Sequence, residues 1–216
     1  MRKLTTLLPA LLLGASAFSA PQGDLLDRAV AAWTKVRTAR ATFEQTIVNP
    51  LTGNTLHAAG EYQQQRPGKL SVRFDAPATD RIVADGKYVW LYLPSSAPGQ
   101  VIRRLQSSAG TGTVDLSAQF LTAPRTRFTV TEAGAQTVSG RPTHAYTLVP
   151  KSPDTEQFKK AVVYIDDADA SIRQFTTTEL SGLERTVRLV SLKTNGPVEA
   201  SSFVFTVPEG TRVVDR

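Results

Sequence analysis

The sequence contains no cysteine among its 216 residues. This absence excludes disulfide bonds, thiolate chemistry and a lipid anchor attached to a cysteine after a signal peptide. Histidine is scarce as well, since only His57 and His144 occur, and their wide separation does not mark a metal site. Stability therefore has to come from packing and hydrogen bonding within the chain.

The sequence also lacks a long hydrophobic run. Residues 4–13 are mostly apolar, but they are too few to span a bilayer, which takes roughly 20 apolar residues. They follow a positive start, Met1-Arg2-Lys3, and precede a tail of small residues at 14–20. This is the three-part layout of a secretory signal peptide. We expect residues 1–19 to be that signal and residues 20–216 to form one soluble domain outside the cytoplasm.

Neither sign of charge dominates the chain. It has 25 Lys and Arg against 19 Asp and Glu, a net charge of +6, and its basic residues are scattered singly. Scattered charge is typical of a solvated face, and export removes nucleic acid as a partner. Hydrophobic residues make up 41% of the chain, which is enough to build a core.

Motifs that carry catalysis are missing. The sequence has no Gly-x-Ser-x-Gly, His-Glu-x-x-His, Gly-x-Gly-x-x-Gly or phosphate-binding loop. The acidic run at 166–169 resembles part of a calcium loop but lacks the glycine at the sixth position and has Thr177 at the twelfth. Glu61 and Asp75 would act as a catalytic pair only if the fold brought them together. We expect no enzyme, no metal and no cofactor.

Hydrophobic periodicity predicts one helix followed by many strands. Leu26, Ala29, Val30, Trp33 and Val36 recur at helical spacing after Asp24, a residue suited to an N-cap. From residue 41 the period changes to two and predicts about eleven strands, the last at 202–206. The Asp85-Gly86 dipeptide predicts a hairpin with positive φ values, and residues 114–121 predict a short helix.

So many antiparallel strands with so little helix indicate a mainly β fold, an unclosed antiparallel barrel. A sheet of this size tends to curl, and its apolar face must be covered. We expect the helices to plug an apolar concave face. An alternative is a solid core, because small barrels are filled by their own side chains. Six apolar residues would serve either case: Leu70, Val72, Phe74, Trp90, Tyr92 and Tyr146.

The order of particular residues resembles a known family. It runs Phe43-x-Gln45, Gly60, Arg66-Pro67-Gly68, Pro77, Asp85-Gly86-Lys87-x-x-Trp90-x-Tyr92-x-Pro94, Leu148-x-Pro150, Phe158, Phe175 and Phe203-x-Phe205-x-x-Pro208-x-Gly210. This order, over about residues 24 to 215, resembles the LolA-like family of periplasmic outer-membrane lipoprotein carriers.

The resemblance implies an unclosed barrel of about eleven strands with an α-helical lid, and a monomer in the periplasm. Its expected ligands are the acyl chains of lipoproteins or lipids, taken from an inner-membrane ABC lipoprotein exporter and passed to a LolB-like acceptor. It implies that Arg66 is the lid latch and that Leu70, Val72 and Phe74 line the cavity, where the first two are aliphatic instead of the usual aromatics. We add Trp90, Tyr92 and Tyr146 as acyl-binding residues. The expected lid residues are Trp33, Leu116, Phe120 and Leu121.

Three other functions compete with the carrier. A sensor of the same fold resembles the amino-terminal domain of RseB-like anti-sigma-factor regulators, which usually carry a further domain. An acceptor of the LolB type needs a cysteine after the signal, and this sequence has none. A hydrolase on a barrel scaffold ranks last, because no nucleophile and base pair is readable.

Overall fold

The computed structural model describes residues 24–108 and 115–216. The predicted signal peptide at 1–19 lies outside these residues, and so does residue 114 at the start of the predicted short helix. Twelve strands form one sheet in the order β12-β6-β5-β4-β3-β2-β1-β11-β10-β9-β8-β7. All neighbours are antiparallel except β12 and β6. Because β12 and β7 end the order without pairing with each other, the barrel is unclosed, as predicted.

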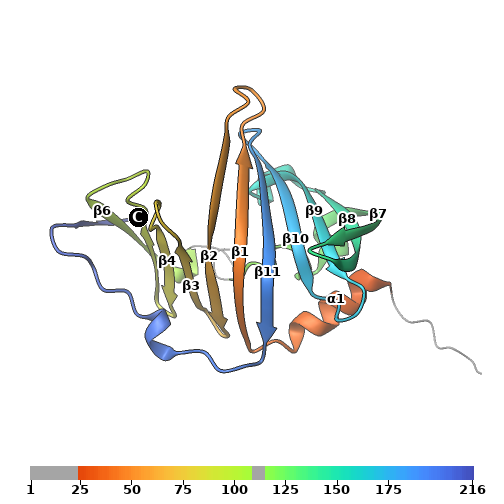
Figure 1. The fold of residues 1–216 in the computed structure, drawn as a ribbon, viewed down its shortest axis with the longest axis horizontal. Helices are drawn as coiled ribbons and strands as arrows, with labels where there is room; N and C mark the ends of the chain where they lie inside the picture. The colour runs from red at the N-terminus through yellow and green to blue at the C-terminus, as the bar shows by residue number, and fades with distance from the viewer. Residues whose placement is uncertain (1–23, 109–114) are drawn as a thin grey trace, which may run out of the picture.

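The strands have these bounds: β1 Thr38–Val48, β2 Thr55–Gln65, β3 Lys69–Phe74, β4 Arg81–Asp85, β5 Tyr88–Tyr92, β6 Gln100–Leu105, β7 Phe128–Val138, β8 Arg141–Pro150, β9 Phe158–Asp166, β10 Ile172–Glu179, β11 Glu184–Thr194 and β12 Arg212–Asp215. Figure 1 shows β2, β1 and β11 as the long central strands, with the sheet turning away on both sides.

The described part of the chain contains three α-helices, one of 10 residues and two of four residues each. They are α1 Leu25–Thr34, α2 Ala118–Leu121 and α3 Pro124–Arg127, and 3₁₀ turns occur at η1 Gln106–Ser108, η3 Pro153–Thr155 and η4 Ala200–Phe203. The prediction of α1 is confirmed, since the Asp24 carboxylate accepts a hydrogen bond from the Asp27 N–H at 3.0 Å. Leu26 and Ala29 on its apolar stripe are fully buried. No helix in the described part of the chain is long and apolar enough to cross a membrane.

The two faces of the sheet follow from the register. Val72 pairs with Ile82, and Ile82 pairs with Leu91, so these three side chains share one face. That face carries the main core, which α1 and α2 also enter. We call it the concave face. Trp90 and Tyr92 flank Leu91 in β5, so they lie on the opposite, outer face.

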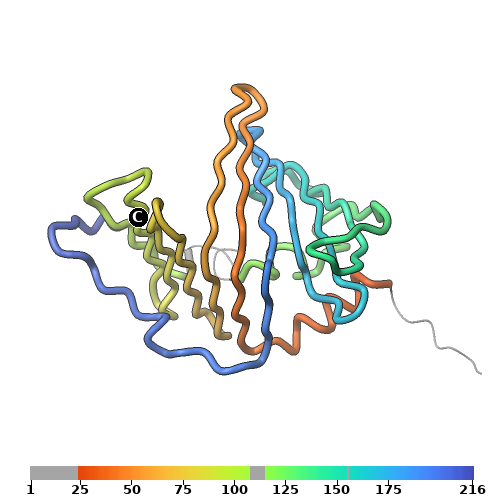
Figure 2. Tube along the Cα trace, viewed as in Figure 1, coloured from red at the N-terminus to blue at the C-terminus, as the bar shows by residue number. Residues whose placement is uncertain are grey.

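The outer face is covered in part by residues 195–211, which leave β11 at the centre of the sheet and reach β12 at its edge. Figure 2 shows this segment in blue along the lower side. The predicted strand at 202–206 is wrong, because η4 ends at Phe203 and residues 204–208 pair with no strand. Because this segment crosses over the outer face and does not lie along an open edge of the sheet, its backbone has no neighbouring strand with which to form ladder hydrogen bonds. Phe203 is buried there instead.

The turn between β4 and β5 differs from the prediction in one respect. Only Gly86 has a positive φ, +102°, while Asp85 ends β4 in extended backbone. The Asp85 carboxylate accepts hydrogen bonds from the N–H groups of Lys87 and Tyr88, both at 2.8 Å. These bonds and the Trp90 indole lower the pKa of Asp85, although its burial acts in the other direction.

Candidate functional site

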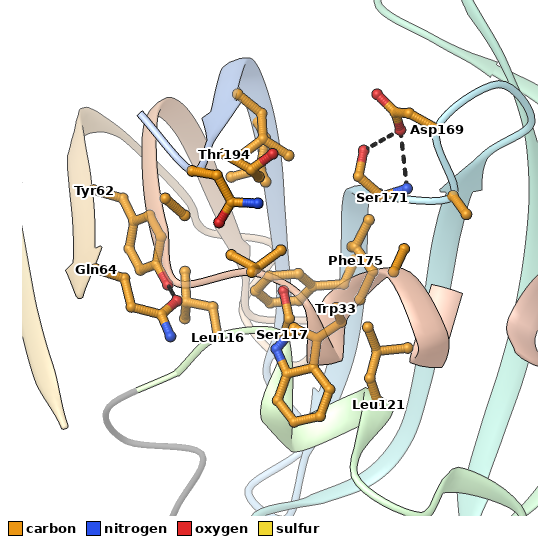
Figure 3. A pocket seen from close by; sticks show the side chains of 18 residues that line it. Trp33, Tyr62, Gln64, Leu116, Ser117, Leu121, Asp169, Ser171, Phe175 and Thr194 are labelled. Atoms are coloured by element: carbon orange, nitrogen blue, oxygen red, sulfur yellow. Dashed lines mark hydrogen bonds between the residues drawn. The ribbon is translucent and has the colours of Figure 1, made fainter. Parts of the chain in front are cut away.

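Two neighbouring pockets open on the concave face, and both are mainly apolar. The smaller one, about 190 Å³, lies against α1 and the start of α2. Figure 3 shows Trp33 and Leu121 beside it, with Tyr62 and Gln64 on another side. The larger one, about 430 Å³, is lined by Phe43, Val72, Phe74, Ile82, Phe158 and Val187 among others. Leu116 and Phe175 line both pockets.

These volumes show whether the interior of the sheet is filled by its own side chains. A dry cavity of about 150 Å³ lined by aliphatic and aromatic side chains can hold a benzene molecule. Both pockets exceed that size, so the interior has room for hydrocarbon. The alternative of a completely filled barrel is therefore wrong.

Arg66 ties the helices to the sheet at the end of β2. Its Nη1 donates to the carbonyls of Trp33 at 2.7 Å and Val36 at 2.9 Å, at the C-terminal end of α1. Its Nε and Nη2 donate to Asp115 Oδ2 at 3.0 Å and 2.8 Å. The guanidinium also lies over the Trp33 ring, 4.2 Å from its centroid. One side chain thus holds α1 and the segment before α2 together.

The Asp115 carboxylate accepts most of the side-chain hydrogen bonds at this position. Its Oδ1 accepts from the N–H groups of Ser117 and Ala118, both at 3.0 Å, and from the Trp33 indole at 3.4 Å. Its Oδ2 also accepts from Gln64 Nε2 at 2.7 Å. The Arg66 and Asp115 side chains are only 21% and 10% exposed, so the ion pair is largely shielded from water.

The network continues into the wall of the smaller pocket. Burial, and then the charge of Asp115, raise the pKa of the Tyr62 hydroxyl. The hydroxyl stays protonated and donates to Gln64 Oε1. We define the Arg66 network as Tyr62, Gln64, Arg66 and Asp115 with the backbone they hold. Sequence reasoning found Arg66 only.

The family model described as Outer membrane lipoprotein carrier protein LolA matches residues 34–206. The chain belongs to the LolA family.

Relatives in the LolA family match along nearly the whole chain. The outer-membrane lipoprotein carrier protein of Sodalis glossinidius is 28% identical, over 99% of this chain and 97% of that protein. The protein of the same name from Chromohalobacter salexigens is also 28% identical, over 87% of this chain and 85% of its own length.

Solved structures show the same fold at lower identity. An uncharacterized conserved protein from Thermus thermophilus has a TM-score of 0.55 at 15% identity, with 89% of this chain and 97% of that one covered. Lipoprotein LppX of Mycobacterium tuberculosis has a TM-score of 0.52 at 15% identity, with 82% and 97% covered.

The cavity residues predicted from the sequence of this LolA-family chain do not all lie on the same face of the sheet. Val72 and Phe74 line the larger pocket, and Leu70 is buried on the same face. Tyr146 is buried in the same core cluster as Leu26 of α1. Its burial, with the nearby carboxylates of Asp24 and Glu132, raises its hydroxyl pKa.

Trp90 and Tyr92 are the exceptions, because they lie on the outer face. The Trp90 ring stacks on Phe205 with centroids 5.5 Å apart, and its indole donates to Asp85 at 2.8 Å. Tyr92 also packs near Phe205, at 6.2 Å. We therefore leave both out of the proposed acyl site. Their role here is to dock the 195–211 crossing segment on the sheet.

The four predicted lid residues lie together at the helices. Trp33 and Leu121 line the smaller pocket, and Leu116 lines both pockets. Phe120 is fully buried, with ring centroids 4.9 Å from Phe175 and 5.9 Å from Phe158. The predicted helix at 114–121 is shorter than expected, since α2 begins at Ala118, and the Asp115 carboxylate accepts hydrogen bonds from the N–H groups of Ser117 and Ala118 where the helix starts. We use lid for α1 together with residues 115–121.

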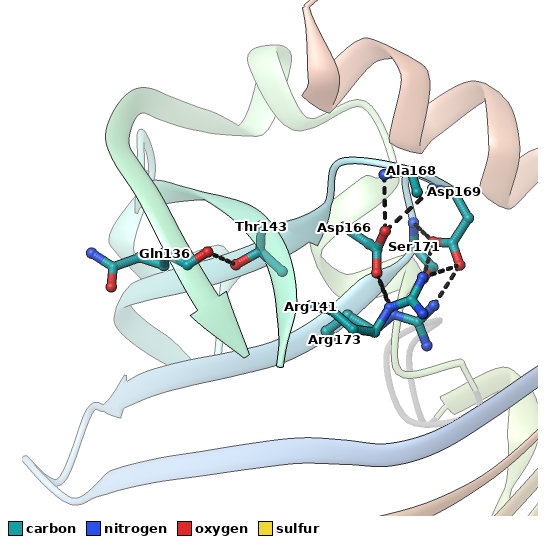
Figure 4. A network of polar contacts seen from close by, with 8 residues as sticks. All are labelled: Gln136, Arg141, Thr143, Asp166, Ala168, Asp169, Ser171 and Arg173. Atoms are coloured by element: carbon teal, nitrogen blue, oxygen red, sulfur yellow. Dashed lines mark hydrogen bonds and ion pairs between the residues drawn. The ribbon is translucent and has the colours of Figure 1, made fainter. Parts of the chain in front are cut away.

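The acidic run at 166–169 forms ion pairs with arginines of the neighbouring strands β8 and β10. Arg141 and Arg173 both contact Asp166, and both also contact Asp169 (Figure 4). His144 contacts Asp167 at 2.7 Å and His57 contacts Thr46 at 3.1 Å. Within the described residues no group of three His, Asp or Glu side chains is placed to hold a metal ion.

Proposed function

We propose that this chain is a periplasmic carrier that buries the acyl chains of outer-membrane lipoproteins in its concave cavity. It takes them from an inner-membrane ABC exporter and passes them to a LolB-like acceptor. The observation that carries this proposal is a pair of apolar pockets beneath a lid that Arg66 holds. Membership of the LolA family supports it independently.

The energetics of acyl chains favour a carrier of this kind. Burying a chain is worth about 0.8 kcal/mol per methylene, so a chain of about 15 methylenes gains on the order of 12 kcal/mol. A lipoprotein with such chains does not cross an aqueous gap unaided. A concave apolar cavity provides the cover that the crossing requires.

Release of the cargo requires that another interaction offset the free energy gained by burying the acyl chains. Acyl chains longer than the present pockets need the lid, including Leu116, to move away from Phe175 of the sheet, which breaks the Arg66 network. Closing the lid restores those bonds, so the closed state competes with the ligand and lowers its net affinity. The Arg66 network therefore sets how easily cargo leaves.

The direct test is to purify the protein from the periplasm under native conditions and identify what it carries by mass spectrometry. We expect acylated protein or lipid. Protein that arrives without ligand and binds no diacylglyceryl-cysteinyl peptide would contradict the carrier function. Capture of a signalling protein with no lipoprotein would favour the sensor instead.

Arg66→Leu tests the latch. We expect uptake of lipopeptide to remain and its transfer to acceptor membranes to slow at least tenfold, because the closed state loses charged hydrogen bonds of about 1.5–3 kcal/mol each. Transfer is measured by the loss of a fluorescent lipopeptide from the carrier.

The matched control is Arg103→Leu, which removes an arginine paired with Asp215 on the outer face. It should transfer at the wild-type rate. Normal transfer by the Arg66→Leu variant would rule out the latch.

A further inference from the structure

The two ends of the concave cavity differ in chemistry. Arg66 directly follows Gln65 of β2, which pairs with Thr38 at the start of β1. Arg185 of β11 pairs with Ile47, near the end of β1. Nine residues of strand separate these positions, roughly 30 Å at 3.3 Å per residue. The lid thus closes one end, and the larger pocket reaches toward the other.

That other end is polar. The larger pocket is lined there by Gln45, Thr177, Glu179 and Arg185, which include the only charged side chains among the described residues that line it, whereas the rest of that lining is aromatic and aliphatic apart from Gln119 and Gln157. Arg185 and Glu179 are 34% and 27% exposed, so they stand at the mouth, between the cavity and solvent. We define Gln45, Glu179 and Arg185 as the rim cluster.

The rim cluster has hydrogen-bond donors to spare. Arg185 Nε donates to Glu179 Oε1 and its Nη1 donates to Gln45 Oε1, both at 2.9 Å. Its Nη2 also approaches Glu179 Oε1 at 2.9 Å. A guanidinium has five N–H groups and a glutamine amide has two, so at most three of seven donors are engaged by these contacts.

We propose, on the basis of the proposed function, that the rim cluster binds the ester and amide carbonyls of the acylated cysteine. Acyl chains that enter the apolar interior bring their carbonyl oxygens to the mouth. A carbonyl that loses its hydrogen bonds to water and finds no other donor destabilises the complex, so donors at the mouth favour an ester-linked lipid. Glu179 offsets the charge of Arg185, which favours neutral carbonyls over the phosphate of a phospholipid.

The test compares two ligands of equal chain length on the wild-type protein. One is a dipalmitoyl-glyceryl-cysteinyl peptide, and the other is its dialkyl ether analogue, which lacks the ester carbonyls. We expect the ester to bind about tenfold more tightly, a difference of about 1.4 kcal/mol. Arg185→Gln should lose this preference and keep its affinity for diphenylhexatriene, a hydrocarbon probe of the cavity.

Arg188→Gln is the matched control, because Arg188 lies on the same strand and pairs with Glu44 on the outer face. It should keep the ester preference. Equal binding of ester and ether by the wild type would overturn the rim assignment whether or not the variant folds, and so would a preference retained by Arg185→Gln. Tighter binding of dipalmitoyl phosphatidylglycerol would also overturn it. If the wild type binds neither lipopeptide nor diphenylhexatriene, the carrier function fails as well.

Discussion

Gly60 shows how one residue shapes the cavity wall. It lies in β2 between Phe43 of β1 and Phe74 of β3, whose rings meet edge to face at 5.4 Å. A Cβ at Gly60 would lie 2.1 Å from the Arg73 carbonyl oxygen and 3.1 Å from the Phe43 ring. The absence of a side chain lets the strands and both rings approach, and both rings line the larger pocket.

Gly60→Ala should therefore lower the free energy of unfolding by about 1–3 kcal/mol, the usual cost of overpacking. The backbone of Arg73 has to shift to admit the methyl group. Urea denaturation followed by circular dichroism measures the change. Gly196→Ala is the control, since nothing lies within 4 Å of a Cβ there. Equal midpoints for the two variants would contradict the account.

At this same scale, the sequence could predict Arg66 but not its partner. Asp115 is 49 positions away, and no spacing rule joins them before the fold is known. Gln64 and Tyr62 were also missed, because alternation alone marks them as strand residues. The outer position of Trp90 and Tyr92 could not be predicted either, because an aromatic in a strand indicates burial without indicating the side. Only the register with Val72 and Ile82 decides that.

Among the elements, the strands that alternate were predicted well, and the errors lie where pairing depends on distant partners. The period of two from residue 41 onward and the hairpin predicted at Asp85-Gly86 correspond to strands of the structure, and β4 and β5 flank that turn. The segment 202–206 has strand-like aromatics, but it crosses the sheet and finds no edge. The true last strand, Arg212–Asp215, is short and pairs in parallel with β6, which no local pattern indicates.

The β9–β10 turn gives an element-scale prediction. Against the effect of its burial, hydrogen bonds from Arg141, the N–H groups of Ala168 and Asp169, and Arg173 lower the pKa of Asp166 to about 2. This carboxylate joins three strands, since Arg141 begins β8 and Arg173 lies in β10. A group whose pKa falls on folding stabilises the protein above its unfolded pKa of about 3.9, and that contribution disappears as the pH falls to about 2.

We therefore expect the wild-type protein to lose on the order of 2 kcal/mol through Asp166 between about pH 4 and pH 2. Asp166→Asn should be less stable at pH 7, because Arg141 and Arg173 each lose one of their two carboxylate partners and keep only Asp169. Its stability should also depend less on pH within that window. Urea melts at intervals from pH 2 to pH 7 measure both effects. A variant with the wild-type slope over that window would show that Asp166 does not carry it.

At the scale of the whole molecule, the two faces of the unclosed sheet differ in what covers them. Its outer face docks the 195–211 segment through Phe203 and Phe205. Its concave face leaves space beneath a lid that is held by polar contacts as well as by packing.

Leu116 is the residue through which this arrangement can be tested, because it lines both pockets. Leu116→Trp should fill the space between them and weaken binding of diphenylhexatriene and of acylated peptide at least tenfold. Overpacking should cost no more than about 1–3 kcal/mol, since the pockets can accept part of the ring. Val204→Trp adds comparable bulk at an outer position that is 68% exposed, and it should bind like the wild type. Full binding by a folded Leu116→Trp protein would place the acyl chains elsewhere and remove the concave cavity from the mechanism.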